Sequence, residues 1–196
     1  MLYLNQLKYP DVPYEHNVGA GGVPPERATV AVAGCGLCCA CMLVENMTLS
    51  HLGLTECRDL SYQAKANMEP GTDMRLLGPL VAEKFGLTYE TTSDKEVLKE
   101  HLRRGGMAIA NSGGDREGYT GVFTRNGHYV LVVSVDGDEV CILDPSYKEG
   151  KYDEPGRQGK VRVEGGFEYC HVDVLAEDCS NRDPSYYLFA RKREGK

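Results

Sequence analysis

The sequence has no long basic block. Its longest positive run is Arg191-Lys192-Arg193, and the formal net charge of the 196 residues is −7. A protein that binds nucleic acid through its phosphates carries a basic footprint, so we expect no nucleic-acid partner. No apolar run approaches the roughly 18 residues that a membrane-spanning helix needs, so we expect no membrane span. The first residues lack a basic start and an apolar segment, which predicts a cytoplasmic protein unless a signal has been removed.

Internal repeats and low-complexity tracts are also absent, which leaves an ordinary globular chain. Hydrophobic residues make up 41% of the sequence and charged residues 26%, a balance typical of a protein with a buried core. At this length the expectation is a single domain over residues 1–196.

Cysteine is abundant, and four of the eight cysteines fall within seven residues. The positions are 35, 38, 39, 41, 57, 141, 170 and 179. Cysteines this close cannot link distant parts of a chain, which argues against a disulfide scaffold. For the seven other than Cys35 we favour reduced, buried thiols that pack as small apolar residues. The spacing of Cys35, Cys38 and Cys41 also permits a redox or metal module, but a second cysteine pair at metal-ligand spacing is absent. We therefore expect no metal and no cofactor.

The first half of the chain is predicted to be mainly helical. Apolar residues recur at helical spacing from Cys35 to about Ser50, and further helices are expected at 55–67, 73–85 and 93–104, the last with Ser93 as N-cap. Short strands are expected at Leu2–Leu4 and 87–91, and a loop at Gly19–Pro25.

The second half is predicted to be mainly β-structure. Strands are expected at 107–110, 129–135, 139–143, 160–164, 167–174 and 185–191, with a hairpin turn at Asp136-Gly137-Asp138. The segment Asn111–Asn126 is polar and glycine-rich, so we expect a long loop bordering a substrate cleft. Helices first and an antiparallel sheet second predict an α+β fold.

Cys35 stands between two glycines at the start of a predicted helix. Glycine lets the chain turn sharply into the helix, and the helix N-terminus favours a thiolate. The alternative is a structural cysteine at a glycine-rich turn.

His128 and Asp144 complete a pattern typical of a thiol enzyme. His128 opens an apolar strand and could act as base toward a thiolate. Asp144 closes the next strand, and the hairpin would bring it back beside His128 because paired strands lie about 5 Å apart. The alternatives are a solvent-facing histidine and a turn-forming Asp-Pro.

One pattern along the chain comprises Gln6, Tyr9-Pro10, Pro13-Tyr14, Gly34-Cys35-Gly36, Gly127-His128-Tyr129 and Asp144-Pro145. This pattern resembles papain-like cysteine peptidases related to the double-glycine-leader (bacteriocin-processing) peptidases. The resemblance covers residues 2 to 147. It implies a papain-like fold and a peptide or protein substrate. It also implies Cys35 as nucleophile, His128 as base, Asp144 as its orienting carboxylate and Gln6 as an oxyanion-hole donor.

This sequence departs from the family pattern immediately after the cysteine. The family usually continues Gly-Cys-Gly-Pro-Thr, whereas here Leu37-Cys38-Cys39 follow Gly36. Leucine and cysteine are compatible with a helix, so the backbone path can be the same. The expected function is cysteine peptidase. A catalytically silent peptide-binding domain of the same fold and a cysteine-rich redox or metal module are the alternatives.

Overall fold

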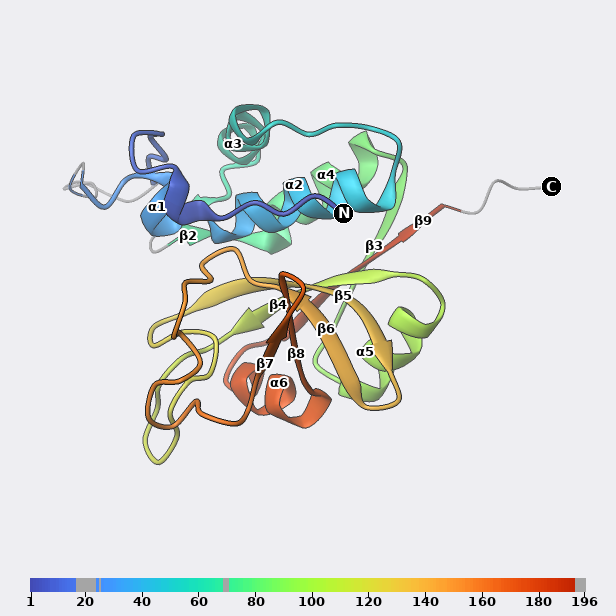
Figure 1. Cartoon of the computed structure of the whole chain (residues 1–196). Helices are drawn as coiled ribbons and strands as arrows, with labels where there is room; N and C mark the ends of the chain where they lie inside the picture. Colours follow the sequence, from blue (N-terminus) through green and yellow to red (C-terminus); the bar gives the residue numbers. More distant parts are fainter. Residues whose placement is uncertain (17–23, 25, 69–70, 193–196) are drawn as a thin grey trace. The chain divides into compact units, whose positions relative to one another are not determined.

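The computed structural model describes residues 1–16, 24, 26–68 and 71–192. The loop predicted at Gly19–Pro25 lies outside these residues except for Pro24. The chain divides into two compact units, Met1–Tyr89 with Ala190–Lys196, and Glu90–Phe189. A single domain over residues 1–196 stays a prediction. Figure 1 shows the elements coloured along the sequence.

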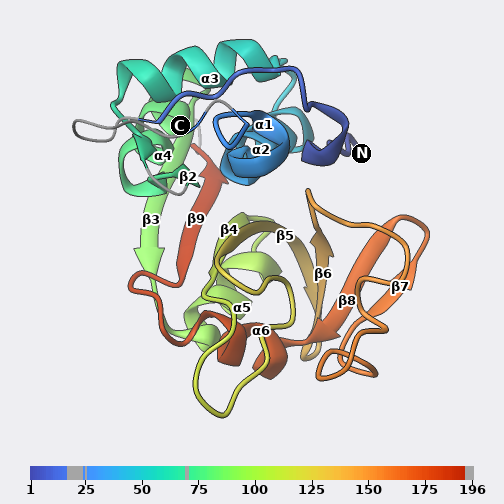
Figure 2. The same cartoon turned by 90° about the vertical axis from the view of Figure 1, so that its left-hand side faces the viewer.

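The first unit is built around one long apolar helix. Cys35 to Met47 form α2, in which every residue from Gly36 to Val44 is buried. Helices α3 and α4 pack against α2 and against each other, as Figure 2 shows. The unit comprises η1 (Gln6–Lys8), α1 (Val30–Ala33), α2 (Cys35–Met47), α3 (Leu54–Gln63), β1 (Asn67–Met68), β2 (Gly71–Thr72), α4 (Met74–Lys84) and the start of β3 (Leu87–Thr92).

The prediction of a strand at Leu2–Leu4 is wrong. The backbone of Leu2 pairs with a side chain instead: its N–H donates to Asn46 Oδ1 (2.8 Å), and its carbonyl accepts from Asn46 Nδ2 (3.1 Å). An amide side chain near the end of α2 thus satisfies the same groups that a neighbouring strand would satisfy.

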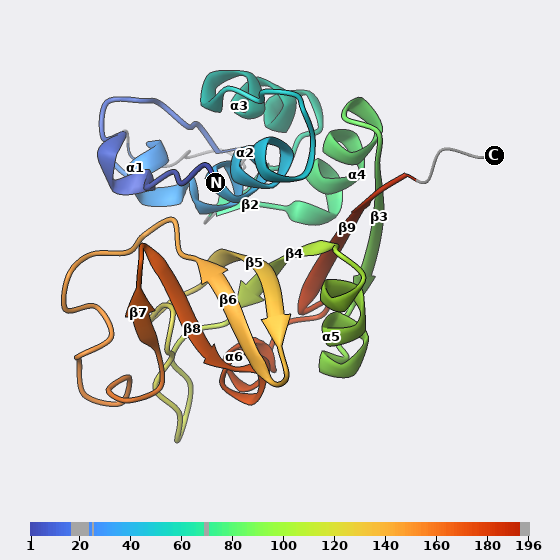
Figure 3. The same cartoon turned by 45° about the vertical axis from the view of Figure 1, so that its right-hand side comes forward.

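The second unit is an antiparallel sheet covered on one face by two helices. The strand order of the sheet is β3-β9-β4-β5-β6-β8-β7, and Figure 3 shows β6, β8 and β7 side by side at one edge. Apolar residues of α5 and α6 share one buried cluster with the inward residues of the central strands. The elements are the end of β3, α5 (Lys95–Arg103), β4 (Met107–Ser112), β5 (His128–Asp136), β6 (Glu139–Leu143), β7 (Arg162–Glu164), β8 (Phe167–His171), α6 (Val172–Cys179) and β9 (Tyr186–Arg191), whose last two residues belong to the first unit.

Two predicted boundaries in this unit are wrong. Helix α5 is capped by Asp94, whose carboxylate accepts from Glu96 N (2.7 Å). Ser93 bonds elsewhere, to Asp183. The strand expected at 167–174 stops at His171, which caps the unpredicted helix α6 by accepting from Asp173 N.

The loop between β4 and β5 is ordered by a buried carboxylate. Asp178 on α6 accepts hydrogen bonds from Val122 N (2.6 Å), Phe123 N (3.2 Å) and the Tyr119 hydroxyl (3.0 Å), and Ser112 Oγ also donates to it. These bonds fix the segment that leads directly into His128. Whether the loop borders a substrate cleft stays a prediction.

Candidate active site

Cys35 is the first residue of α2, as the glycine-flanked sequence predicts. Gly34 links α1 to α2, and a Cβ there would lie 2.5 Å from Val30 Cγ1 and 2.6 Å from Val30 O. Only glycine therefore permits the close turn that brings Cys35 to the start of the helix. The first N–H groups of a helix lack partners within it and carry partial positive charge, so the position favours a thiolate.

Cys35 also differs from its neighbours in exposure. It is partly exposed, whereas Cys38, Cys39 and Cys41 are fully buried. Burial raises the pKa of Cys38 well above its usual value. For Cys41, contact with Cys57 and then burial do the same. All eight cysteines are thiols. Of the seven cysteines other than Cys35, six are buried and Cys141 is partly exposed. The prediction of buried thiols is therefore confirmed for six of the seven.

Gln6 lies in the same unit as Cys35, in the short helix η1. Its Nε2 donates to the carbonyl of Ala31 in α1 (2.9 Å), which fixes the orientation of the amide. Its Oε1 is buried and has no hydrogen-bond partner among the described residues. Because an amide nitrogen carries two hydrogens, one N–H remains beyond the bond to Ala31.

His128 and Asp144 meet in the second unit. Strands β5 and β6 pair antiparallel with Leu131 opposite Leu143, and this register brings Asp144 beside His128. The Nε2 atom of His128 lies 2.7 Å from Asp144 Oδ1. Asp144 Oδ1 also accepts from Ser146 N (2.8 Å) and so closes the turn after β6, as an Asp-Pro turn predicts. A catalytic role for Asp144 stays a prediction.

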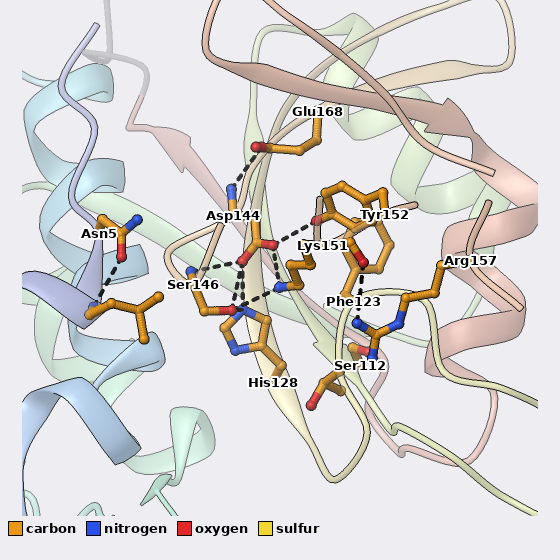
Figure 4. A network of polar contacts seen from close by, with 12 residues as sticks. Asn5, Ser112, Phe123, His128, Asp144, Ser146, Lys151, Tyr152, Arg157 and Glu168 are labelled. Carbon is orange, nitrogen blue, oxygen red and sulfur yellow. Dashed lines mark hydrogen bonds and ion pairs between the residues drawn. The ribbon is translucent and has the colours of Figure 1, made fainter. Parts of the chain in front are cut away.

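Three residues that the sequence did not single out complete this cluster, which Figure 4 shows with the side chains converging on Asp144. Lys151 Nζ lies 2.5 Å and the Tyr152 hydroxyl 2.6 Å from Asp144 Oδ2. Ser146 Oγ lies 3.0 Å from His128 Nε2 and 3.2 Å from Asp144 Oδ1. The only local signal was Asp-Pro-Ser, which is typical of a turn.

Asp144 is held as a carboxylate. Its side chain is 0% exposed, and burial alone would raise its pKa. The charges of His128 and Lys151, with their hydrogen bonds, outweigh burial and hold the pKa of Asp144 well below its usual range. An ionised Asp144 accepts the Nε2 proton of His128. In the neutral imidazole this tautomer leaves the lone pair on Nδ1.

The side chain of Glu168 on β8 binds the backbone of Asp144. Its Oε2 accepts from Asp144 N (3.0 Å). Burial, with the charge of Asp144, raises the pKa of Glu168 to about 8. Glu168 is therefore mostly protonated at neutral pH.

We expect stability to fall as Glu168 ionises. A carboxyl whose pKa is 4.5 when unfolded and about 8 when folded stabilises the fold fully below pH 4.5, and this contribution is lost as pH rises through 8. Glu168→Gln mimics the protonated form. Relative to the parent, its free energy of unfolding should rise by about 4 kcal/mol between pH 5 and pH 8.5, measured by urea unfolding. The exposed Glu117 provides a control, Glu117→Gln. If the free energies of unfolding of Glu168→Gln and the parent differed by the same amount at pH 5 and pH 8.5, the raised pKa of Glu168 would be contradicted.

Among the described residues, no group of three or more His, Cys, Asp or Glu side chains is arranged to hold a metal ion. None of the helices formed by the described residues is long and apolar enough to cross a membrane.

Comparison with known proteins gives a likeness of fold. No family model matches the sequence, and no curated protein matches it. A solved structure described as a "putative C39-like peptidase" from Bacillus anthracis matches with a TM-score of 0.58 and 13% sequence identity. The match covers 99% of this chain and 96% of that one. The chain therefore has the α+β, papain-like fold that its sequence predicts.

Proposed function

We propose that this protein is a cysteine peptidase that uses Cys35 as nucleophile and the His128–Asp144 pair as its base. The observation that carries the proposal is the 2.7 Å contact between His128 Nε2 and Asp144 Oδ1. This contact sets the tautomer in which Nδ1 accepts a proton. The likeness of fold to a protein described as a C39-like peptidase supports the same class.

The proposed reaction is acyl transfer. Cys35 Sγ attacks the carbonyl carbon of a peptide bond while its proton passes to His128 Nδ1. His128 then gives that proton to the departing amine nitrogen as the C–N bond breaks, leaving an acyl group on sulfur. Water, deprotonated by His128, attacks this thioester and releases the acid and the thiol.

Gln6 and the backbone of Cys35 are proposed to stabilise the oxyanion. The remaining Nε2 hydrogen of Gln6 and the Cys35 N–H are the donors. Because Cys35 and Gln6 come from one compact unit and His128 and Asp144 from the other, the proposal treats residues 1–196 as one functional domain.

Selective alkylation tests the proposal. During brief exposure to iodoacetamide near neutral pH, Cys35 should label at least about tenfold faster than Cys38, because Cys35 combines partial exposure with a helix N-terminus and, in this proposal, is the cysteine that His128 serves as base. His128→Ala should slow this labelling strongly. The exposed His51 contacts Glu45, so His51→Ala is a control that should leave the rate unchanged. Mass spectrometry locates the adducts.

Equal labelling of Cys35, Cys38 and Cys39, unaffected by His128→Ala, would contradict an activated nucleophile. That result would favour the catalytically silent peptide-binding domain instead.

A further inference from the structure

A buried lysine lies next to the proposed base. Lys151 is 5% exposed, and its Nζ contacts Asp144 Oδ2 (2.5 Å) and Ser146 Oγ (2.8 Å). Ser146 Oγ is in turn 3.0 Å from His128 Nε2. Lysine is almost never buried unless paired. Lys151 pairs with Asp144, the carboxylate proposed to orient His128, so Lys151 and His128 share one carboxylate.

Several contacts outside the cluster hold Lys151 in this place. Its N–H donates to Lys148 O (3.1 Å), and its own carbonyl accepts from Arg157 Nη1 (3.5 Å). Arg157 is itself buried, and its Nε donates to Gly121 O (2.9 Å) in the loop that precedes His128. The backbone of Lys151 is thus fixed by the fold, and this places its ammonium beside Asp144.

The charges around Asp144 determine what Lys151 does. Tyr152 stays neutral, because burial and then the charge of Asp144 raise its pKa well above its usual value. Glu168 on β8 is mostly protonated at neutral pH, because burial and then the charge of Asp144 raise its pKa to about 8. Arg157 is paired with Glu154 (3.2 Å). Within the second unit the negative charge of Asp144 is therefore already balanced by Lys151 when His128 is neutral.

We propose that Lys151 is a positioning residue that shares the Asp144 carboxylate with His128 and thereby weakens the stabilisation that this carboxylate gives to a protonated imidazole. The inference rests on the proposed role of His128 as the base. A protonated His128 would add a second positive charge beside one buried carboxylate, which is unfavourable where water is excluded. The neutral imidazole, which is the form that accepts the thiol proton during attack, is favoured by this sharing.

The test measures the titration of His128 directly. In a full-length Cys35→Ala protein with ¹³C-labelled histidine, the ring signals of His128 are followed by NMR against pH. Lys151→Met removes the positive charge and keeps an apolar side chain of similar length. It should raise the pKa of His128 by about one to two units. Lys151→Arg keeps the charge and should titrate like the parent, as should Lys148→Met at an exposed lysine nearby.

A second variant guards against misfolding. Lys151→Gln keeps an N–H donor for Asp144 without the charge, and it should raise the pKa of His128 in the same direction. An unchanged titration in a folded Lys151→Met or Lys151→Gln protein would overturn the inference. Since the readout uses a Cys35→Ala protein, it does not depend on catalysis. A parent that hydrolyses no peptide would refute the proposed function and leave this result intact.

Discussion

Replacement of Cys35 by alanine is expected to abolish peptide hydrolysis, with a loss of at least about 10⁴-fold in kcat. The thiolate forms the covalent intermediate, and no other described cysteine combines the start of a helix with partial exposure. Cys141 is the matched control, because it is also partly exposed but lies in the middle of β6. Cys141→Ala should retain the parent kcat. The assay follows cleavage of a mixed fluorogenic peptide library, with circular dichroism to confirm folding.

Cys35→Ser sharpens this test. A hydroxyl is a far weaker nucleophile than a thiolate at neutral pH, so the serine protein should be nearly as inactive as the alanine protein. Retention of more than a tenth of the parent rate in either folded variant would show that hydrolysis does not pass through Cys35.

Removal of Asp144 is expected to have a large effect on stability as well as on activity. Asp144→Ala leaves Lys151 buried without its carboxylate and leaves the Tyr152 hydroxyl without its acceptor. Breaking a buried ion pair from one side destabilises proteins by about 3–5 kcal/mol. The free energy of unfolding from urea titration should fall by that amount. Asp153→Ala, at an exposed aspartate in the same loop, should change it by no more than about 0.5 kcal/mol.

The double variant tests whether the loss comes from the unpaired lysine. With Lys151→Met added to Asp144→Ala, no ammonium remains buried, so the double variant should be more stable than Asp144→Ala alone. If Asp144→Ala were no more destabilising than Asp153→Ala, the buried pairing of Asp144 and Lys151 would be refuted.

The fold could be predicted where local chemistry decides the structure. The glycines around Cys35 and the apolar run after it predict the start of α2, and Asp136-Gly137-Asp138 predicts the β5–β6 hairpin. Gly137 has a φ of 58°, a conformation that glycine adopts easily. The hairpin then fixes the register, so the proximity of His128 and Asp144 followed from the sequence alone.

The remainder depended on contacts between distant segments. The cap of α5 lies one residue later than the sequence predicts, because Ser93, a residue type that caps helices well, donates its hydroxyl hydrogen to Asp183. The sequence does not predict helix α6, because the first residues of α6 continue the β-rich composition of β8. Lys151 lies in a long stretch between β6 and β7 that has no periodicity. Its place beside Asp144 depends partly on Arg157, which links two loops.

The central claim is that Cys35 and His128 act on one another, and a short bifunctional alkylating agent tests it most directly. With one equivalent of 1,3-dibromoacetone, Cys35 should react first and the tethered bromide should then alkylate His128, because the bridge spans only three carbons. Proteolysis and mass spectrometry should give one major cross-linked peptide pair, Cys35 to His128. Quantitative modification of Cys35 with no link to His128, or with links to other residues instead, would contradict the account.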